Sequence, residues 1–122
     1  MLPPIFTLLS TDAACSAVLG AGGASRVYPF GEAPADVPRP YVTWFMVGGF
    51  AHSSMSDKPA ADEMTVQVDC WADTAASAKA VAMAVRDSLE TIGDLTNYNP
   101  SDRDPETKRY RMSFDIEIQL KR

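Results

Sequence analysis

The alternation of apolar and polar side chains over residues 110–121 constrains the fold more than any other feature of the sequence. The apolar positions are Tyr110, Met112, Phe114, Ile116, Ile118 and Leu120, with polar or charged residues between them. Successive side chains of a β-strand point to opposite faces of its sheet. This pattern therefore predicts a long strand with one buried face, and residues 64–72 predict a second strand in the same way.

Helices are expected to cover the buried face of this sheet. Val81, Val85 and Leu89 fall at helical spacing in an alanine-rich stretch, which predicts a helix that begins at a cap on Asp73 or Thr74. Two short helices are expected before residue 20. A Pro-Pro pair at 3–4 suits the first turn of a helix, and the glycines at 20–23 suit a helix end.

The segment 41–47 is predicted to be a strand that is apolar on both faces. Val42, Trp44 and Met46 share one face, and Tyr41, Phe45 and Val47 share the other. An isolated two-layer domain needs only one apolar sheet face. The second face therefore needs a cover, which is either a local loop or a neighbouring subunit.

The whole pattern predicts a small α+β fold in a single domain, residues 1–122. A short strand is expected at 26–29, and loops are expected at 31–40, 48–61 and 93–108, where prolines, glycines and small polar residues gather. The predicted order is ααβββαβ. It corresponds to a four-stranded antiparallel or mixed sheet with helices packed on one face.

No group of residues in the sequence is typical of catalysis, of a metal site or of a cofactor site. His52 is the only histidine, and it has no neighbouring ligand residues. Cys70 shares the strand parity of buried valines, and an apolar setting raises the pKa of a thiol and makes it unreactive. We therefore expect no enzyme activity, no cofactor and no metal. A small enzyme that uses Asp69, Cys70 or His52 stays as a remote alternative.

Charge and hydrophobicity limit the partners further. The formal net charge of −5 argues against tight binding to DNA phosphates. No apolar run approaches the roughly 20 residues that cross a bilayer, and no signal peptide is readable. We expect synthesis in the cytoplasm and no membrane contact.

The outer face of the last predicted strand carries charges of both signs. Arg109, Arg111 and Lys121 lie toward its ends, and Asp115 and Glu117 lie between them. Two interpretations are equally open. The face is either solvated, or it is self-complementary and pairs with the opposite charges of a neighbouring copy, which would set register more than affinity.

Several short segments, in this order, resemble the phage tail-completion proteins, also called tail terminators. They are Pro3-Pro4 before Ile5, Arg26-Val27-Tyr28-Pro29, Arg39-Pro40-Tyr41-Val42, Gln67-Val68-Asp69-Cys70-Trp71 ahead of a helix, and the closing strand over 110–116. The resemblance spans nearly the whole chain, from Pro3 to Leu120. It implies a structural virion protein that is not an enzyme.

The resemblance also implies an assembly and its partners. Family members form a homohexameric ring that caps the tail tube, stops its polymerisation and presents a surface to the head–tail connector protein. The expected partners are therefore other copies of the chain, the tail tube protein and the connector. DNA passes through the lumen without specific binding, and the expected location is the tail or neck of the virion after synthesis in the host cytoplasm.

Two other non-enzymatic functions remain open at this point. One is a head–tail joining (neck) protein. The other is an adaptor that binds a peptide by strand addition at an exposed sheet edge.

A ring requires two different patches that meet on neighbouring copies. We expect one patch on the outer face of 41–47, with Tyr41, Phe45 and Val47, together with the loop that follows it. The other is expected on the first helix (Ile5, Phe6, Leu9) or on the charged face of the last strand (Arg109, Arg111, Asp115, Glu117).

Overall fold

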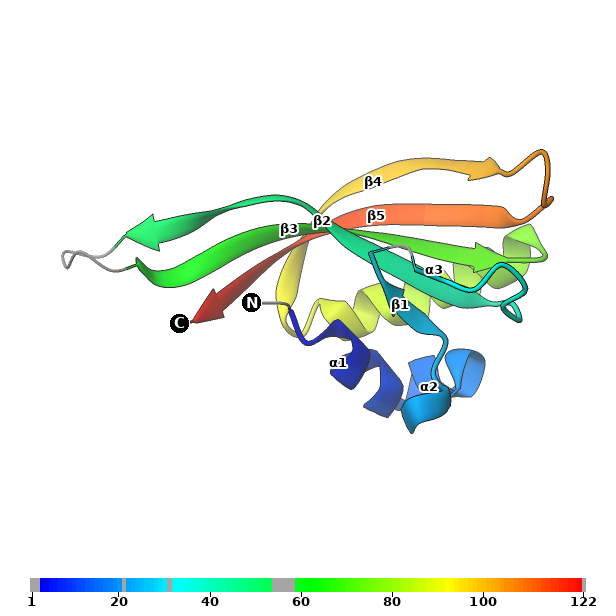
Figure 1. Ribbon diagram of the computed structural model, residues 1–122, viewed down its shortest axis with the longest axis horizontal. Coiled ribbons are helices and arrows are strands. Elements are labelled where there is room, and N and C mark those ends of the chain that lie inside the picture. Colours follow the sequence, from blue (N-terminus) through cyan, green and yellow to red (C-terminus); the bar gives the residue numbers. More distant parts are fainter. Residues whose placement is uncertain (1–2, 21, 31, 54–58, 122) are drawn as a thin grey trace.

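The computed structural model describes residues 3–20, 22–30, 32–53 and 59–121 and shows two layers, a sheet and a helical layer (Figure 1). Within these residues the α-helices are α1 (Ile5–Thr11), α2 (Ala13–Leu19) and α3 (Ala75–Leu89), and a 3₁₀ turn, η1 (Gly22–Ala24), follows α2. The strands are β1 (Val27–Pro29), β2 (Tyr41–Ser53), β3 (Pro59–Ala72), β4 (Gly93–Arg103) and β5 (Tyr110–Lys121). All three α-helices lie on one side of the sheet.

The sheet is mixed, with the strand order β1-β2-β3-β5-β4. β1 runs parallel to β2, and the other neighbouring strands are antiparallel. The predicted α+β class, with helices on one face, is confirmed. The sheet has five strands instead of four, so the order of elements is ααβββαββ.

The additional strand, β4, occupies most of the segment 93–108 that the sequence predicts to be a loop. It pairs with β5, but its register shifts between Leu95 and Asn97 and again between Asn99 and Asp102. β4 is also an edge strand, and most of its side chains are exposed. A polar, irregular edge strand does not show the alternation by which buried strands are recognised, and this explains the wrong prediction.

The predicted loop at 48–61 is wrong for residues 48–53 and 59–61, because β2 and β3 continue there as a hairpin well beyond the helices (Figure 1). Residues 54–58 lie outside the part of the chain that the structure describes. We call residues 47–53 and 59–65 of this hairpin the arm. Its ladder reaches as far as the pair Ser53 and Pro59. Backbone pairing between small residues forms the arm, so the sequence there lacks a hydrophobic pattern and resembles a loop.

The hydrophobic core lies between the helices and the inner face of the sheet. Leu9, Leu19 and Leu89 from the three α-helices are fully buried against Phe114 and Ile116 of β5. Truncating a buried leucine to alanine in such a core costs about 2–5 kcal/mol. The body of the subunit therefore supplies most of its stability.

Local caps fix the ends of the helices. The Thr74 hydroxyl accepts a hydrogen bond of 3.1 Å from the backbone N–H of Ser77 at the start of α3, as the sequence predicts. At α2 the Asp12 carboxylate accepts from the N–H of Cys15 at 3.0 Å, which holds the pKa of Asp12 below its ordinary value. Both caps satisfy donors that the helix itself leaves unpaired.

Arg26 ties the small helices to the sheet. Its guanidinium donates hydrogen bonds of 2.8 Å to the carbonyl oxygens of Pro40 and Val18. These bonds join the end of α2, the start of β1 and the start of β2. Arg26 therefore connects the end of α2 to the segment that leads into β2.

Candidate functional site

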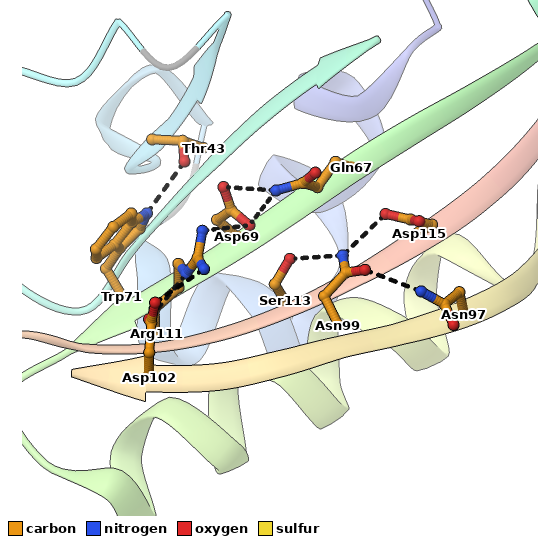
Figure 2. Close-up of polar contacts among 10 residues, drawn as sticks. All are labelled: Thr43, Gln67, Asp69, Trp71, Asn97, Asn99, Asp102, Arg111, Ser113 and Asp115. Carbon is orange, nitrogen blue, oxygen red and sulfur yellow. Dashed lines mark hydrogen bonds and ion pairs between the residues drawn. The ribbon is translucent and has the colours of Figure 1, made fainter. Parts of the chain in front are cut away.

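The sheet face opposite the helices carries a continuous set of polar and aromatic contacts (Figure 2). We call it the open face. Its side chains include Tyr41 and Thr43 of β2, Gln67, Asp69 and Trp71 of β3, Asn97, Asn99 and Asp102 of β4, and Arg111, Ser113, Asp115 and Glu117 of β5. Alternation along each strand places these residues together, since the residues next to them along the strand point toward the core, while their partners in the ladder share the open face.

One end of the open face is aromatic. The rings of Tyr41 and Trp71 stack with centroids 6.0 Å apart and an interplanar angle of 9°. The Arg109 guanidinium lies 5.5 Å from the centre of the Tyr41 ring and also donates to the Tyr41 hydroxyl at 2.8 Å. The Trp71 indole N–H donates to Thr43 Oγ1 at 3.1 Å. Tyr41 is consequently 5% exposed, and its cover comes from its own chain.

An ion network lies beside the aromatic end. Arg111 donates two hydrogen bonds of 3.0 Å to the two carboxylate oxygens of Asp102, and its Nη1 lies 3.9 Å from Asp69 Oδ1. Asp69 also accepts from Gln67 Nε2 at 3.1 Å. The Asp69 side chain is 6% exposed, whereas that of Asp102 is 56% exposed. A buried carboxylate requires such partners, because desolvation without compensation is costly.

Asn99 connects the edge strand to β5. Its amide Nδ2 donates to Ser113 Oγ at 2.9 Å and to Asp115 Oδ1 at 3.0 Å, and its Oδ1 accepts from Asn97 Nδ2 at 2.9 Å. These bonds lie next to the register shift between Asn99 and Asp102. The side chains thus hold β4 on the sheet where the backbone ladder is interrupted.

The residues of the enzyme alternative do not converge. Cys70 is fully buried in the core, and desolvation raises the pKa of its thiol. The backbone of His52 pairs with Ala61, ten residues along β2 from Val42, which pairs with Cys70. At about 3.3 Å per strand residue, that separation is roughly 30 Å. The side chain of His52 lies outside the part that the structure describes.

The described residues hold neither a cluster of metal ligands nor a membrane-spanning helix. They contain no group of three or more His, Cys, Asp or Glu side chains that could hold a metal ion. None of the helices in the described part is long and apolar enough to cross a membrane.

The predicted interface residues of the first helix are placed differently from one another. Ile5 and Leu9 are fully buried in the core of the subunit, because they face the sheet and α3. Phe6 is 40% exposed. Of the three, only Phe6 offers substantial surface to a partner.

The outer-face residues of β2 differ in the same way. Tyr41 is covered by Trp71 and Arg109, Phe45 is half-buried, and Val47 is 49% exposed. The sequence argument left the cover of this face open between a local loop and a neighbour. Around Tyr41 the cover is local, and Arg109 also donates to the carbonyl of Ala35 at 3.0 Å, in the loop before β2.

The charged residues of β5 are engaged within the subunit. Arg111 and Arg109, which comes just before β5, contact aromatic rings, and Asp115 accepts from Asn99. Glu117 is half-buried opposite another carboxylate, Asp94, in the ladder. The sequence reasoning missed two contributors, Asp102 and Asn99, because it predicted a loop there. The alternate placement of two asparagines, at 97 and 99, was the available signal of a strand.

Large apolar side chains that stay exposed gather at opposite lateral edges of the sheet. Phe30 and Val47, near β2, are 51% and 49% exposed, and Met83 and Tyr98, beside β4, are 45% and 59% exposed. Met83 and Tyr98 line an apolar groove of about 300 Å³ between α3 and the sheet. Its floor is formed by Met112 and Phe114, among others.

Comparisons with known proteins give a family match and a fold match. A family model described as "Tail completion protein gp17" matches residues 3–121. Fifteen chains of solved structures match. One comes from "Virion of native gene transfer agent (GTA) particle", with a TM-score of 0.64 and 19% identity, over 97% of this chain and 92% of that chain. At this identity the likeness shows the fold alone. No curated protein sequence matches significantly.

Proposed function

Because the chain belongs to the tail completion protein gp17 family, we propose that its copies form a homohexameric ring that caps the end of a phage-like tail tube. Membership makes the chain a phage-like tail completion protein, a structural and non-enzymatic component of the virion. The family match over residues 3–121 carries the proposal. The partners are other copies of the chain, the tube protein and the head–tail connector protein.

The mechanism is steric. A ring of these subunits covers the growing end of the tube and offers no equivalent end to the next tube ring, so polymerisation stops. Its other side presents the surface to which the head attaches. DNA passes through the lumen, and the net charge of −5 suits a wall that does not retain phosphates.

Two observations support an assembled rather than a solitary subunit. The arm extends past the helices (Figure 1). Exposed apolar side chains lie near β2 and beside β4, which are on opposite sides of the sheet. A closed ring requires two unlike patches on each copy. We also take residues 1–122 as one folded unit, since a single core cluster joins the three α-helices to strands of the sheet from β1 to β5.

Removal of the gene from the producing system tests this function. Loss of a terminator leaves tails of uncontrolled length that carry no heads, and resupply of the chain restores both uniform length and joining. Electron microscopy of the particles measures both quantities. Tails of normal length without heads would instead assign the chain a joining role alone, and joined particles of normal length would contradict the proposal.

A further inference from the structure

We infer that the outer edge of β2 around Val47 and Gly48 packs into the groove between α3 and β4 of the next copy. This inference rests on the proposed ring and names the two patches that would close it. Both patches consist of described residues, and neither belongs to the polar network of the open face.

The β2 edge is the first patch because most of it has no neighbouring strand. β1 pairs only with Val42–Trp44, so β2 continues from Phe45 to Ser53 with β3 on one side and no described strand on the other. These nine residues include no Asp, Glu, Lys, Arg or Pro. Soluble proteins usually protect a long free edge with charges or proline. The β2 ladder does shift register between Met46 and Gly48 and between His52 and Ser53, but its free edge lacks charges and proline and is therefore expected to be covered in the assembled state.

The opposite edge strand, β4, is protected in the usual way. It contains Asp94, Pro100 and Asp102, and its ladder is interrupted by two register shifts. Its backbone is consequently a poor template for strand addition. The groove beside it, rather than its backbone edge, is the part that suits a partner.

Two adjacent glycines lie in the first patch, and they differ in what surrounds them. A Cβ atom on Gly49 would lie 2.5 Å from the carbonyl oxygen of Glu63, so β3 of the same chain requires a glycine there. A Cβ atom on Gly48 would meet nothing within 4 Å, and its backbone is not in the left-handed region. A glycine inside a strand costs stability and often marks close approach of another backbone. Gly48 lies at the register shift between Met46 and Gly48, and the open space around it also leaves room for the backbone of a neighbouring copy.

The groove is the second patch because it is apolar, open and on the other side of the sheet. Exposed Met83 and Tyr98 form its walls, and its volume of about 300 Å³ accommodates apolar side chains. β3 and β5 separate β2 from β4, which places the two edges about 14 Å apart at ordinary strand spacing. The patches cannot cover each other within one subunit, so two copies must bring them together.

Charge complements this pairing. Lys79 and Arg86 line the groove, and Asp62 and Glu63 lie on the arm beside the β2 edge. Opposite charges at the rim of an interface steer and orient association. The same arrangement disfavours contact between two arms, because their acidic residues would face each other.

The test uses particles that contain the doubly substituted chain Val47→Cys with Met83→Cys, treated with a short bis-maleimide. The native cysteines, Cys15 and Cys70, are buried and do not compete. The expected product is a ladder of covalent oligomers, with monomers alone from each single variant. Dimers from Val47→Cys alone would show that β2 edges pair with one another and would overturn the inference. Capped, joined tails that give no covalent oligomers would overturn the inferred interface and leave the proposed function intact. Tails that do not contain the chain at all would contradict both the interface and the proposed function.

A second variant checks the role of Gly48 without crosslinking. Gly48→Val should lower the yield of joined particles at least about tenfold, as expected when a central contact is lost. The unfolding midpoint of the isolated subunit should not fall. Gly23→Val is the matched control, because a Cβ there also meets nothing within 4 Å. Normal joining by Gly48→Val, or an equal loss in the Gly23 variant, would contradict the inference.

Discussion

Arg111 holds Asp102 through two parallel hydrogen bonds of 3.0 Å, and this pair crosses from β5 to the edge strand β4. The same guanidinium also lies 3.9 Å from Asp69, whose side chain is nearly buried. A single arginine therefore compensates an exposed and a buried carboxylate at the same time. The energetic consequences of losing either contact differ.

Replacing Arg111 with methionine should destabilise the subunit by about 1–3 kcal/mol, because the buried Asp69 loses the guanidinium that lies 3.9 Å from it. Urea unfolding measures the change. Asp102→Asn is the control and should cost less than about 1 kcal/mol, since that carboxylate is largely solvated. The double variant Arg111→Met with Asp69→Asn should recover part of the loss, and equal losses in all three variants would refute the argument.

Asn99→Ala should loosen the edge strand selectively. The substitution removes the hydrogen bonds to Ser113 and Asp115 beside the register shift, at a cost of about 1 kcal/mol. Amide hydrogen exchange should speed up in β4 and stay unchanged in β3. Asn97→Ala, which removes one exposed bond, serves as the comparison. Uniform acceleration across the sheet would show that Asn99 supports the whole fold instead.

The two adjacent glycines should respond oppositely in the isolated subunit. Gly49→Ala forces a Cβ against the Glu63 carbonyl at 2.5 Å and should lower the unfolding midpoint by several degrees. Gly48→Ala removes backbone freedom from the unfolded chain without a clash and should leave the midpoint unchanged or raise it. Differential scanning calorimetry of both variants decides this. A loss in Gly48→Ala as large as in Gly49→Ala would mean that the arm itself requires both glycines.

Stability should fall in alkaline solution because of the buried thiols. Desolvation raises the pKa of Cys15 from 9.0 to about 12 and also raises that of Cys70. Unfolded thiols lose protons above pH 9 while native ones keep them, so stability is full below pH 9 and declines as pH rises toward 12. The slope is about 1.4 kcal/mol per pH unit for each thiol. Urea titrations at pH 8 and pH 10 measure it.

A double variant, Cys15→Ala with Cys70→Ala, isolates the contribution of the thiols from that of other alkaline groups. It should show a shallower decline between the two pH values, although its stability at pH 8 is lower. Identical slopes in the variant and the parent chain would rule out the thiols as the cause.

The parts of the fold that bury side chains were predictable from the sequence, and the parts built on backbone pairing were not. The alternation in β5 and the stripe of Val81, Val85 and Leu89 each report a buried face, and the structure confirms both elements. The arm and β4 bury little, so their sequences carry glycine, serine and asparagine, as loops do. Hydrogen bonds along a backbone leave no periodic trace in side-chain chemistry.

The interface predictions show the same limit. Parity along the strand placed Tyr41 correctly on the outer face, but it could not show that Trp71 and Arg109 would cover the ring. The helical stripe likewise contains Ile5 and Leu9, which are buried, beside Phe6, which is not. Whether an apolar side chain is buried in the core or exposed to a partner depends on its tertiary neighbours. A single sequence does not specify those neighbours.

The arm lies beyond the layer of helices, so the residues that make the fold and those that reach outward are largely separate. Substitutions in the arm that keep the Gly49 contact leave the buried core unchanged. The arm can therefore diverge between related particles more freely than the core. The same fold is then able to fit different partner proteins through changes in the arm, and the arm sequence is expected to change faster than the core sequence.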